Sequence, residues 1–344
     1  MHVAGVEGNV LASRLGKRPA VLILYNQVDA VIKGERIDLI SDQETARVAQ
    51  EVAAGLSGLG YRTQAVGVRH DVAAALAPYS PDEWVVFNLI ESLGGDSALE
   101  QTVPPIYEAL GFRYTGNAAP AMARCLDKAG TKAFLASHGL HTPRYALVNC
   151  LGEPCPVSLP AIVKPSAEDA SVGITYDSVV SDAAALERQV AYIVERYRQP
   201  ALVEEFVDGR EFNCAIWGNE APESLPISEI SFADFPDPLQ RILTYESKWV
   251  EDSFAYSHTP GVCPAQVAPN DAERLNETAR EAYRLTGCRG YARVDIRWRD
   301  GTPFIMEVNP NPSLAPEGGF VRAAGAAGFD YAHMAERILL LATL

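Results

Sequence analysis

The apolar and polar residues in the first third of the chain alternate between runs of strand length and stretches with helical spacing. Strands are predicted over residues 21–25, 62–68 and 84–89. Between the first two strands, apolar residues recur every three or four positions, which predicts a helix that begins at Ser41 or Asp42 and ends at Gly60. This succession of strands and helices predicts a parallel sheet covered by helices.

The pattern changes near residue 117, where short helices and prolines replace the regular alternation. Helices are predicted over residues 118–126, 131–138, 182–196 and 271–286. A further strand ends at Lys164, and several strands alternate with long loops after residue 201. We therefore expect an α/β (α+β) chain of three modules, with the parallel sheet in the first, over residues 1–117, 118–203 and 204–344.

Residues 291–310 form the segment with the most candidate chemistry. Two strand-like runs flank Asp300-Gly301, a dipeptide typical of a tight hairpin turn. Because side chains alternate along a strand, the polar residues of each run share one face. These residues are Arg293, Asp295 and Arg297 on the first strand, and Glu307 and Asn309 on the second.

The length of the turn decides whether the two polar faces coincide. A two-residue turn places Asp295 opposite Met306. A three-residue turn, with Gly301 left-handed, places Arg293 opposite Glu307 and Asp295 diagonal to it. We expect the longer turn, because it gathers two carboxylates, an amide oxygen and a guanidinium on one surface. Such oxygen ligands suit Mg²⁺, although a solvated face of an amphipathic hairpin would show the same alternation.

Several isolated residues are candidates for nucleotide contacts, and each has a plain structural alternative. Lys164 precedes a loop rich in hydroxyl groups and could hold phosphates, or it could be solvated; Lys128 and Lys248 have the same ambiguity. Residues 204–207 could contact an adenosine or form an edge strand. Trp249 could pack in the core or cover a substrate.

The charge balance narrows the classes of partner. The chain has 344 residues and a formal net charge of −15, with 44 acidic against 29 basic residues. This disfavours proteins that coat nucleic acids or anionic membranes, which need basic surfaces, whereas a small anionic ligand needs only a few lysines. The six scattered cysteines and the lack of a long apolar run predict reduced thiols in a cytoplasmic protein. Neither a P-loop nor a dinucleotide-binding glycine fingerprint is present.

Nine segments, taken together and in order, resemble those of the D-alanine–D-alanine ligases, which belong to the ATP-grasp superfamily. They are residues 87–95, 114–116, 127–128 with 131–132, 162–165, 204 with 209–211, 245–248, 263–265, 293–295 and 307–312. The resemblance implies a three-module fold that clamps ATP between the central and C-terminal modules. It also implies a reaction in which ATP converts a carboxylate to an acyl phosphate and an amine then attacks it, giving an amide, ADP and phosphate. A homodimer is implied as well.

The same resemblance implies roles for individual residues. Lys128, Lys164 and Lys248 would contact the ATP phosphates, with Lys248 on a mobile loop, and Ser171 keeps its place in the phosphate loop. The remaining roles are Glu204 and Val207 for the adenosine, Glu211 for the ribose, Asp295, Glu307 and Asn309 for Mg²⁺ or Mn²⁺, and Arg293 for the transition state.

The segments expected to hold the substrates depart from the family pattern. Residues 26–29 replace a substrate-binding glutamate, and Glu91-Ser92 replaces a His-Gly pair. We expect Glu91 to hold a substrate amine or to form an ordinary turn, and Trp249 and Ser313 to lie on the substrate side. A ligase with altered substrates is therefore expected. An authentic D-alanine–D-alanine ligase, a ring-closing ligase and a non-catalytic nucleotide-binding subunit are the alternatives.

Overall fold

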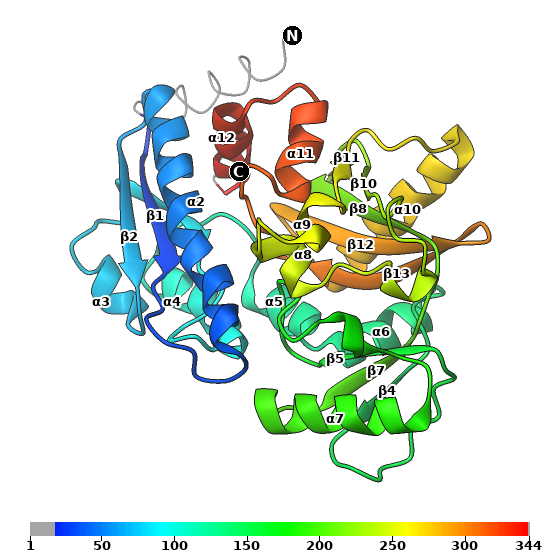
Figure 1. Ribbon diagram of the computed structural model, residues 1–344. Coiled ribbons are helices and arrows are strands. Elements are labelled where there is room, and N and C mark those ends of the chain that lie inside the picture. The colour runs from blue at the N-terminus through cyan, green and yellow to red at the C-terminus, as the bar shows by residue number, and fades with distance from the viewer. Residues whose placement is uncertain (1–17, 343–344) are drawn as a thin grey trace.

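Three β-sheets organise the chain, and each is built from a different stretch of the sequence (Figure 1). The computed structural model describes residues 18–342; the rest of the first and last expected modules lies outside this part. The first sheet is parallel, as predicted, and has the order β2 (Thr63–Val68), β1 (Ala20–Asn26), β3 (Trp84–Leu89). Its helices are α2 (Leu39–Gly58), α3 (Val72–Leu76) and α4 (Val103–Ala109).

The first helix begins earlier than the sequence pattern indicates. It starts at Leu39, and a short 3₁₀ turn over Arg36–Asp38 leads directly into it. The Asp38 carboxylate accepts a hydrogen bond of 2.7 Å from the backbone N–H of Glu35, which holds this turn in place. The predicted N-cap at Ser41 or Asp42 is therefore wrong, because the 3₁₀ turn leads without a break into the helix at Leu39.

The second sheet is antiparallel and is covered by α7 (Ala183–Tyr197). Its strands are β4 (Tyr145–Val148), β7 (Ala201–Glu205), β5 (Ala161–Pro165) and β6 (Val179–Val180), in that order. The expected module boundary between residues 203 and 204 falls inside β7.

The third sheet is the largest and consists of antiparallel strands from the C-terminal part of the chain. Its order is β11 (Gly261–Val262), β10 (Ser228–Ile230), β8 (Arg210–Trp217), β12 (Tyr291–Arg299), β13 (Thr302–Asn309), with β9 (Glu223–Ser224) beside β8. The short helices α8 (Tyr245–Trp249) and α9 (Phe254–Ser257) lie in the connection between β10 and β11.

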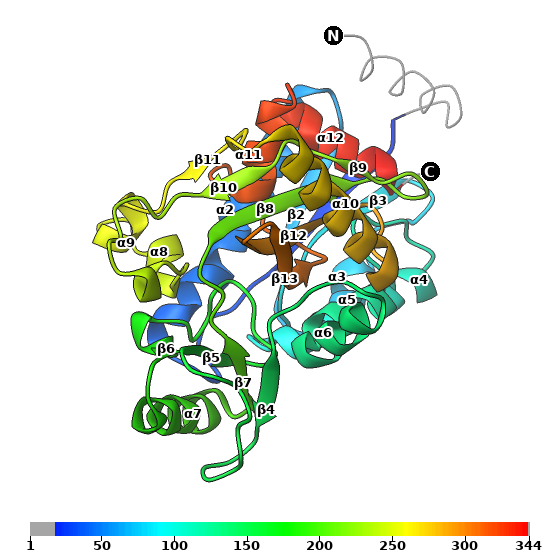
Figure 2. The same cartoon turned by 90° about the vertical axis from the view of Figure 1, so that its right-hand side faces the viewer.

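Alternation along β8 directs its side chains to two different layers of helices. Cys214 and Ile216 belong to a core with α10 (Pro269–Thr286) and with residues of α5 (Ala119–Leu126) and α6 (Lys128–Ser137). Figure 2 shows α10 beside β8. Ala215 and Trp217 face α11 (Gly319–Ala326) on the other side. The helices α5 and α6, expected in the central module, thus pack on the C-terminal sheet.

The two ends of the described chain share one apolar core. Val21 and Ile23 of β1 and Val52 of α2 are fully buried in the same cluster as Ile338 and Leu339 of α12 (Tyr331–Leu341). The Tyr61 hydroxyl also donates a hydrogen bond of 2.8 Å to the Glu336 carboxylate. Within residues 18–342, no helix is both long and apolar enough to cross a membrane, and all six cysteines are free thiols.

Asn117 joins the first module to the C-terminal sheet. Its amide NH₂ donates to the backbone oxygens of Tyr291, at 2.9 Å, and Pro310, while its oxygen accepts from the backbone N–H of Arg289 at 2.7 Å. The side chain is only 3% exposed. Asn117 therefore connects the beginning of β12 with the residue that follows β13.

Replacing Asn117 with alanine should destabilise the protein by about 3 kcal/mol, because one buried and two partly buried backbone groups lose their partner. Urea-induced unfolding measures this change. Asn149→Ala is the control, since Asn149 is exposed and its contacts are local; its effect should stay within about 0.5 kcal/mol. Equal effects of the two substitutions would contradict the bridging role of Asn117.

Candidate active site

The predicted hairpin forms over β12 and β13, but its turn is shorter than expected. Arg299 pairs with Thr302, so the turn consists of Asp300 and Gly301 alone. Both residues are left-handed, with φ of 50° and 76°, as a two-residue turn between twisted strands requires. The predicted three-residue turn is therefore wrong.

A β-bulge restores the shared face that the shorter turn alone would have lost. Ile296 pairs with Ile305, but Asp295 pairs with Glu307, so Met306 is an extra residue in β13. The Met306 carbonyl accepts a hydrogen bond of 2.7 Å from Lys132 of α6. Because of this bulge, Asp295 lies directly opposite Glu307 rather than diagonal to it.

The polar side chains of the hairpin form one connected group. Arg293 donates from Nε and Nη2 to the two oxygens of Asp295, at 2.7 and 2.8 Å. Asn309 donates to Asp295 at 3.0 Å and to Glu307 at 3.3 Å. On the neighbouring strand β8, Asn213 donates to Asp295 at 2.7 Å. The opposite face of the hairpin is buried and apolar, as predicted.

The donor set of this group suits a magnesium ion. Among residues 18–342, no group of three or more His, Cys, Asp or Glu side chains is placed to hold a metal ion. Asp295, Glu307 and Asn309 instead offer two carboxylates and one amide oxygen. Mg²⁺ commonly uses one or two carboxylates and completes its shell with water and phosphate oxygens. The residues therefore fit the ion if a phosphate is bound beside them.

Lysine side chains from three other segments of the chain lie near Glu307. Lys128 Nζ lies 3.9 Å from the Glu307 carboxylate and 2.6 Å from Asp169. Burial alone would raise the pKa of Glu307, but Lys128, Lys164 and Lys248 outweigh it and hold this pKa well below its usual value. Glu307 is therefore a carboxylate at neutral pH, as a metal ligand must be.

Glu204 is fully buried and paired with two lysines. Its two oxygens lie 2.8 Å from Lys132 Nζ and 2.9 Å from Lys164 Nζ. Burial opposes its ionisation, yet the two lysines lower the pKa of Glu204 below its ordinary value. Glu204 thus links Lys164, on the neighbouring strand, to Lys132 of α6, which also contacts β13.

The residue proposed for the ribose has a cationic partner as well. Glu211 of β8 lies 2.6 Å from Arg297 of β12, and Arg297 also donates to the backbone oxygens of Gly209 and Arg241. Both side chains point to the same face of the sheet as Asp295. Val207, in the connection between β7 and β8, is buried.

The loop after Lys164 is held in a strained conformation. Ala170 and Ser171 both have left-handed backbones, with φ of 54° and 62°, which is uncommon for residues other than glycine. The Ala170 carbonyl accepts a hydrogen bond of 3.0 Å from the indole N–H of Trp249 on α8. Lys248 lies on the same helix, and burial together with Arg293 lowers its pKa. The helix α8 therefore covers this loop.

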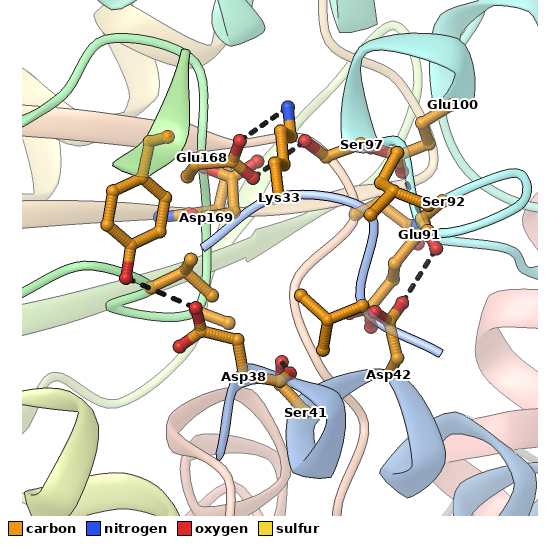
Figure 3. Close-up of a pocket in the computed structure, with 18 of the residues that line it drawn as sticks. Lys33, Asp38, Ser41, Asp42, Glu91, Ser92, Ser97, Glu100, Glu168 and Asp169 are labelled. Carbon is orange, nitrogen blue, oxygen red and sulfur yellow. Dashed lines mark hydrogen bonds and ion pairs between the residues drawn. The ribbon is translucent and has the colours of Figure 1, made fainter. Parts of the chain in front are cut away.

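A cavity lies between the first module, the loop after Lys164 and the end of β13 (Figure 3). Its volume is about 100 Å³, whereas one water occupies about 10–15 Å³ on the same measure. Six of its lining side chains are carboxylates: Asp38, Asp42, Glu91, Glu100, Glu168 and Asp169. Of the other residues proposed for the site, Asn309 also lines it.

Burial and mutual repulsion affect the acidic groups of the cavity. Burial, with Asp42 and Asp169 nearby, raises the pKa of Glu91 to about 8. Burial also raises the pKa of Glu100 well above its usual value, although Asn311 donates to it at 2.7 Å. These carboxyl groups are thus held in a space that disfavours their negative charge.

Polar contacts at the cavity join the first module to the loop after Lys164 and to α7. Lys33 Nζ lies 2.6 Å from Glu168, and the Tyr197 hydroxyl donates to Asp38 at 3.1 Å. Residues from the connection between β1 and α2 therefore close the cavity against the second sheet. Ser313 lies in the loop after β13, where its hydroxyl accepts from the backbone N–H of Ala315 at 3.2 Å.

Several residues of the site were not among the candidates, because their importance depends on the tertiary structure. They are Lys132, Asn213, Lys33 and Asp42. Lys132 lies within one of the family-like segments, and Asn213 lies two positions from Glu211 on the same strand face. The strand alternation from Glu211 was thus a signal for Asn213, whereas no local pattern indicated Lys33 or Asp42.

Comparison with known proteins gives a consistent picture. The family described as D-ala D-ala ligase C-terminus matches residues 148–340. The uncharacterized protein y4sG of Sinorhizobium fredii is 33% identical over 301 residues, which cover 85% of this chain and 86% of that protein. A D-alanine–D-alanine ligase of Desulforudis audaxviator is 32% identical over 312 residues, 86% of this chain and 92% of that enzyme.

Solved structures agree at the level of the fold. The crystal structure of D-alanine–D-alanine ligase from Bacillus anthracis has a TM-score of 0.75 and covers 95% of this chain and 98% of that one, at 22% identity. The structure of the same enzyme complexed with ATP has a TM-score of 0.73 at 21% identity. The arrangement of the three sheets is therefore that of the ATP-grasp fold expected from the sequence.

Replacing Glu91 with glutamine should stabilise the protein in a pH-dependent way. A carboxyl group whose pKa is raised by folding, here from 4.5 to about 8, favours the folded state fully below pH 4.5, and this stability is lost as pH rises to about 8. Glutamine has no charge to bury. At about pH 8.5 the variant should therefore have a higher melting temperature than the wild type, and a free energy of unfolding that is larger by about a few kcal/mol.

The difference between the two proteins should shrink near pH 5, where Glu91 is already protonated. Thermal unfolding scans at both pH values measure it. Glu83→Gln is the control, because this side chain is 65% exposed, and its effect should not change between the two pH values. A constant difference for Glu91→Gln would show that the carboxyl group is not strained by burial.

Proposed function

The chain belongs to the D-alanine–D-alanine ligase family, and we propose that it is an ATP-dependent ligase that joins a carboxylate to an amine. One observation carries the proposal: Arg293, Asp295, Glu307 and Asn309 lie on one surface, with Lys128 facing them from a different part of the chain. This surface combines groups for a divalent cation with groups for a polyanion. It lies beside the cavity lined by Glu91, Glu100 and Asn309.

The proposed reaction needs ATP because a carboxylate is a poor electrophile. A carboxylate oxygen attacks the γ-phosphorus, the bond between that phosphorus and the bridging oxygen breaks, and ADP leaves. The amine then attacks the carbonyl carbon of the acyl phosphate and gives up a proton, and phosphate leaves. Catalysis of both steps depends on positioning and on stabilisation of negative charge.

The cationic side chains divide these tasks in our proposal. Lys128, Lys164 and Lys248 bind the ATP phosphates, and Ser171 contributes its hydroxyl from the loop after Lys164. Arg293 donates to the oxyanion that develops on the attacked carbonyl. The contacts of Lys128 and Lys164 with carboxylates keep their ammonium groups in place before ATP arrives.

The nucleotide and the metal ion take the neighbouring positions. We propose that Glu204 and Val207 contact the adenosine and that Glu211 accepts from the ribose. Lys132, Lys164 and Arg297 orient these two glutamates. Asp295, Glu307 and Asn309 would hold Mg²⁺, or Mn²⁺ in its place. The ion would neutralise charge on the phosphate oxygens during transfer.

The substrates are proposed to be small amino-acid or peptide-like molecules in the cytoplasm. Glu91 would hold an amine, and Trp249 and Ser313 would lie near the substrates. The relatives named D-alanine–D-alanine ligase favour that dipeptide synthesis as a second candidate. We also propose a homodimer, by analogy with the family.

ADP and phosphate release with Mg-ATP should require a carboxylate substrate, and amide should form only when an amine is also present. The measurement uses single amino acids and pairs from a broad panel. Efficient synthesis of D-alanyl-D-alanine would favour the second candidate. Binding of ATP without turnover on any panel member would contradict the ligase proposal.

Glu307→Gln should leave the fold intact and reduce Mg²⁺-dependent turnover by roughly 100-fold or more. The reason is that the substitution removes the negative charge with which Glu307 would bind the ion and attract the neighbouring lysines. Steady-state ADP release measures the loss, and circular dichroism checks the fold. Glu273→Gln, on an exposed face of α10, is the matched control and should retain full activity. Wild-type activity of Glu307→Gln would rule out the proposed metal ligand.

A further inference from the structure

We propose that the cavity binds a substrate that carries two positively charged nitrogen groups on a short carbon chain. This inference rests on the proposed ligase function and specifies its substrate class. Such a molecule is either a basic amino acid, whose carboxylate is activated, or a diamine, which acts as the nucleophile.

The cavity has a large excess of acidic side chains. Lys33 is the one cationic residue among the described residues that line it, against six carboxylates. Two of these six form ion pairs within the protein, and a third, Asp38, accepts hydrogen bonds without a cationic partner. Glu168 pairs with Lys33 at 2.6 Å, Asp169 pairs with Lys128 at 2.6 Å, and Asp38 accepts from Tyr197 at 3.1 Å.

The other three, Asp42, Glu91 and Glu100, lack a cationic partner. Figure 3 shows them on one side of the cavity, across from Glu168 and Asp169. One Asp42 oxygen accepts from Asn26 and Ser92, at 2.9 and 2.7 Å, which leaves its second oxygen for a ligand. None of the three carboxylates forms an ion pair with any residue in the range 18–342.

Glu91 and Glu100 are the groups that point to a ligand. The Glu91 side chain has no hydrogen-bond or ion-pair partner among the described residues, although its backbone N–H is bound by Asn26. Glu100 is only 9% exposed, and only its Oε1 has a partner, Asn311. Carboxylates buried without a counter-charge are costly unless a ligand supplies one. The raised pKa values of Asp42, Glu91 and Glu100 agree with this shortage.

The number of carboxylates sets the number of charges on the ligand. The single ammonium of a simple amino acid would pair with one of the three acidic groups and leave the other two without an ion-pair partner. A ligand with two cationic groups matches Asp42, Glu91 and Glu100 better, because each cationic group could lie between two neighbouring carboxylates. The cavity is also lined by Asn309, one of the proposed metal ligands. A basic amino acid could therefore place its carboxylate toward the phosphate and its two amines toward the first module.

Matched substrate pairs test the proposal directly. Lysine is compared with norleucine, and 1,4-diaminobutane with butylamine in the presence of alanine, using both enantiomers of each amino acid. The members of each pair differ by one terminal amine. We expect kcat/KM for ADP release to be at least about tenfold higher for the dicationic member, because a site with buried polar groups discriminates strongly against ligands that leave them unpaired. The pair that shows the preference identifies the source of the second charge.

Glu91→Gln and Asp42→Asn should reduce the ratio of kcat/KM between the two members of a pair by about tenfold or more. The ratio is the readout, because Glu91 is proposed to hold an amine and its loss lowers turnover of both members. Glu44→Gln is the control, because Glu44 lies on the same helix as Asp42 but contacts Arg47 outside the cavity. The preference should be unchanged in this control. Equal or better turnover of norleucine and butylamine by the wild type would overturn the proposal while leaving the ligase function intact.

Binding measurements separate the two levels of the proposal. If no pair supports ADP release, the ligase function fails, and calorimetric titration with lysine and norleucine in the presence of ADP and Mg²⁺ still tests the cavity. Binding of lysine that is lost in Glu91→Gln would support the dicationic site. Failure of lysine to bind, or binding as tight for norleucine, would refute it.

Discussion

The register between β12 and β13 is the constraint on which the rest of the site depends. A one-residue slip in a strand directs every side chain to the other face. The extra residue Met306 places Glu307 opposite Asp295 despite the two-residue turn, and Lys132 satisfies the carbonyl that the bulge exposes. Lys132 also pairs with Glu204. One buried lysine thus connects the geometry of the hairpin with the position of the second sheet.

Charge in this protein is organised in two unlike regions. Around the hairpin, acidic and basic groups alternate in space, and each carboxylate has a cation or an amide donor nearby. In the cavity beside it, Asp42, Glu91 and Glu100 form no ion pair with any described residue, and the Glu91 side chain has no hydrogen-bond partner there either. The net charge of −15 is therefore unevenly distributed. Acidic and basic side chains balance where phosphates are proposed to bind, whereas acidic side chains outnumber basic ones where a substrate is proposed to bind.

The residues that could be predicted from the sequence are those whose local pattern has one structural outcome. Alternation placed Arg293 and Asp295 on one face, and apolar periodicity located the parallel sheet. The length of the turn was predicted wrongly, because a two-residue turn with a β-bulge and a three-residue turn both bring the polar residues of the two strands to one face. The partners Lys132 and Lys33 were missed because each contacts residues more than 60 positions away. Resemblance to a family supplied the nucleotide roles, and no pattern within the chain could replace it.

The shared core of α2 and α12 has a consequence for biosynthesis. The buried face of α2 is completed only by the last helix of the chain, and nearly the whole protein lies between them in sequence. Ribosomes add about 5–20 residues per second, so α2 emerges tens of seconds before its partner helix exists. During this interval the first module carries an uncovered apolar surface. A nascent chain of this protein therefore exposes this face of α2 to solvent until α12 has been synthesised.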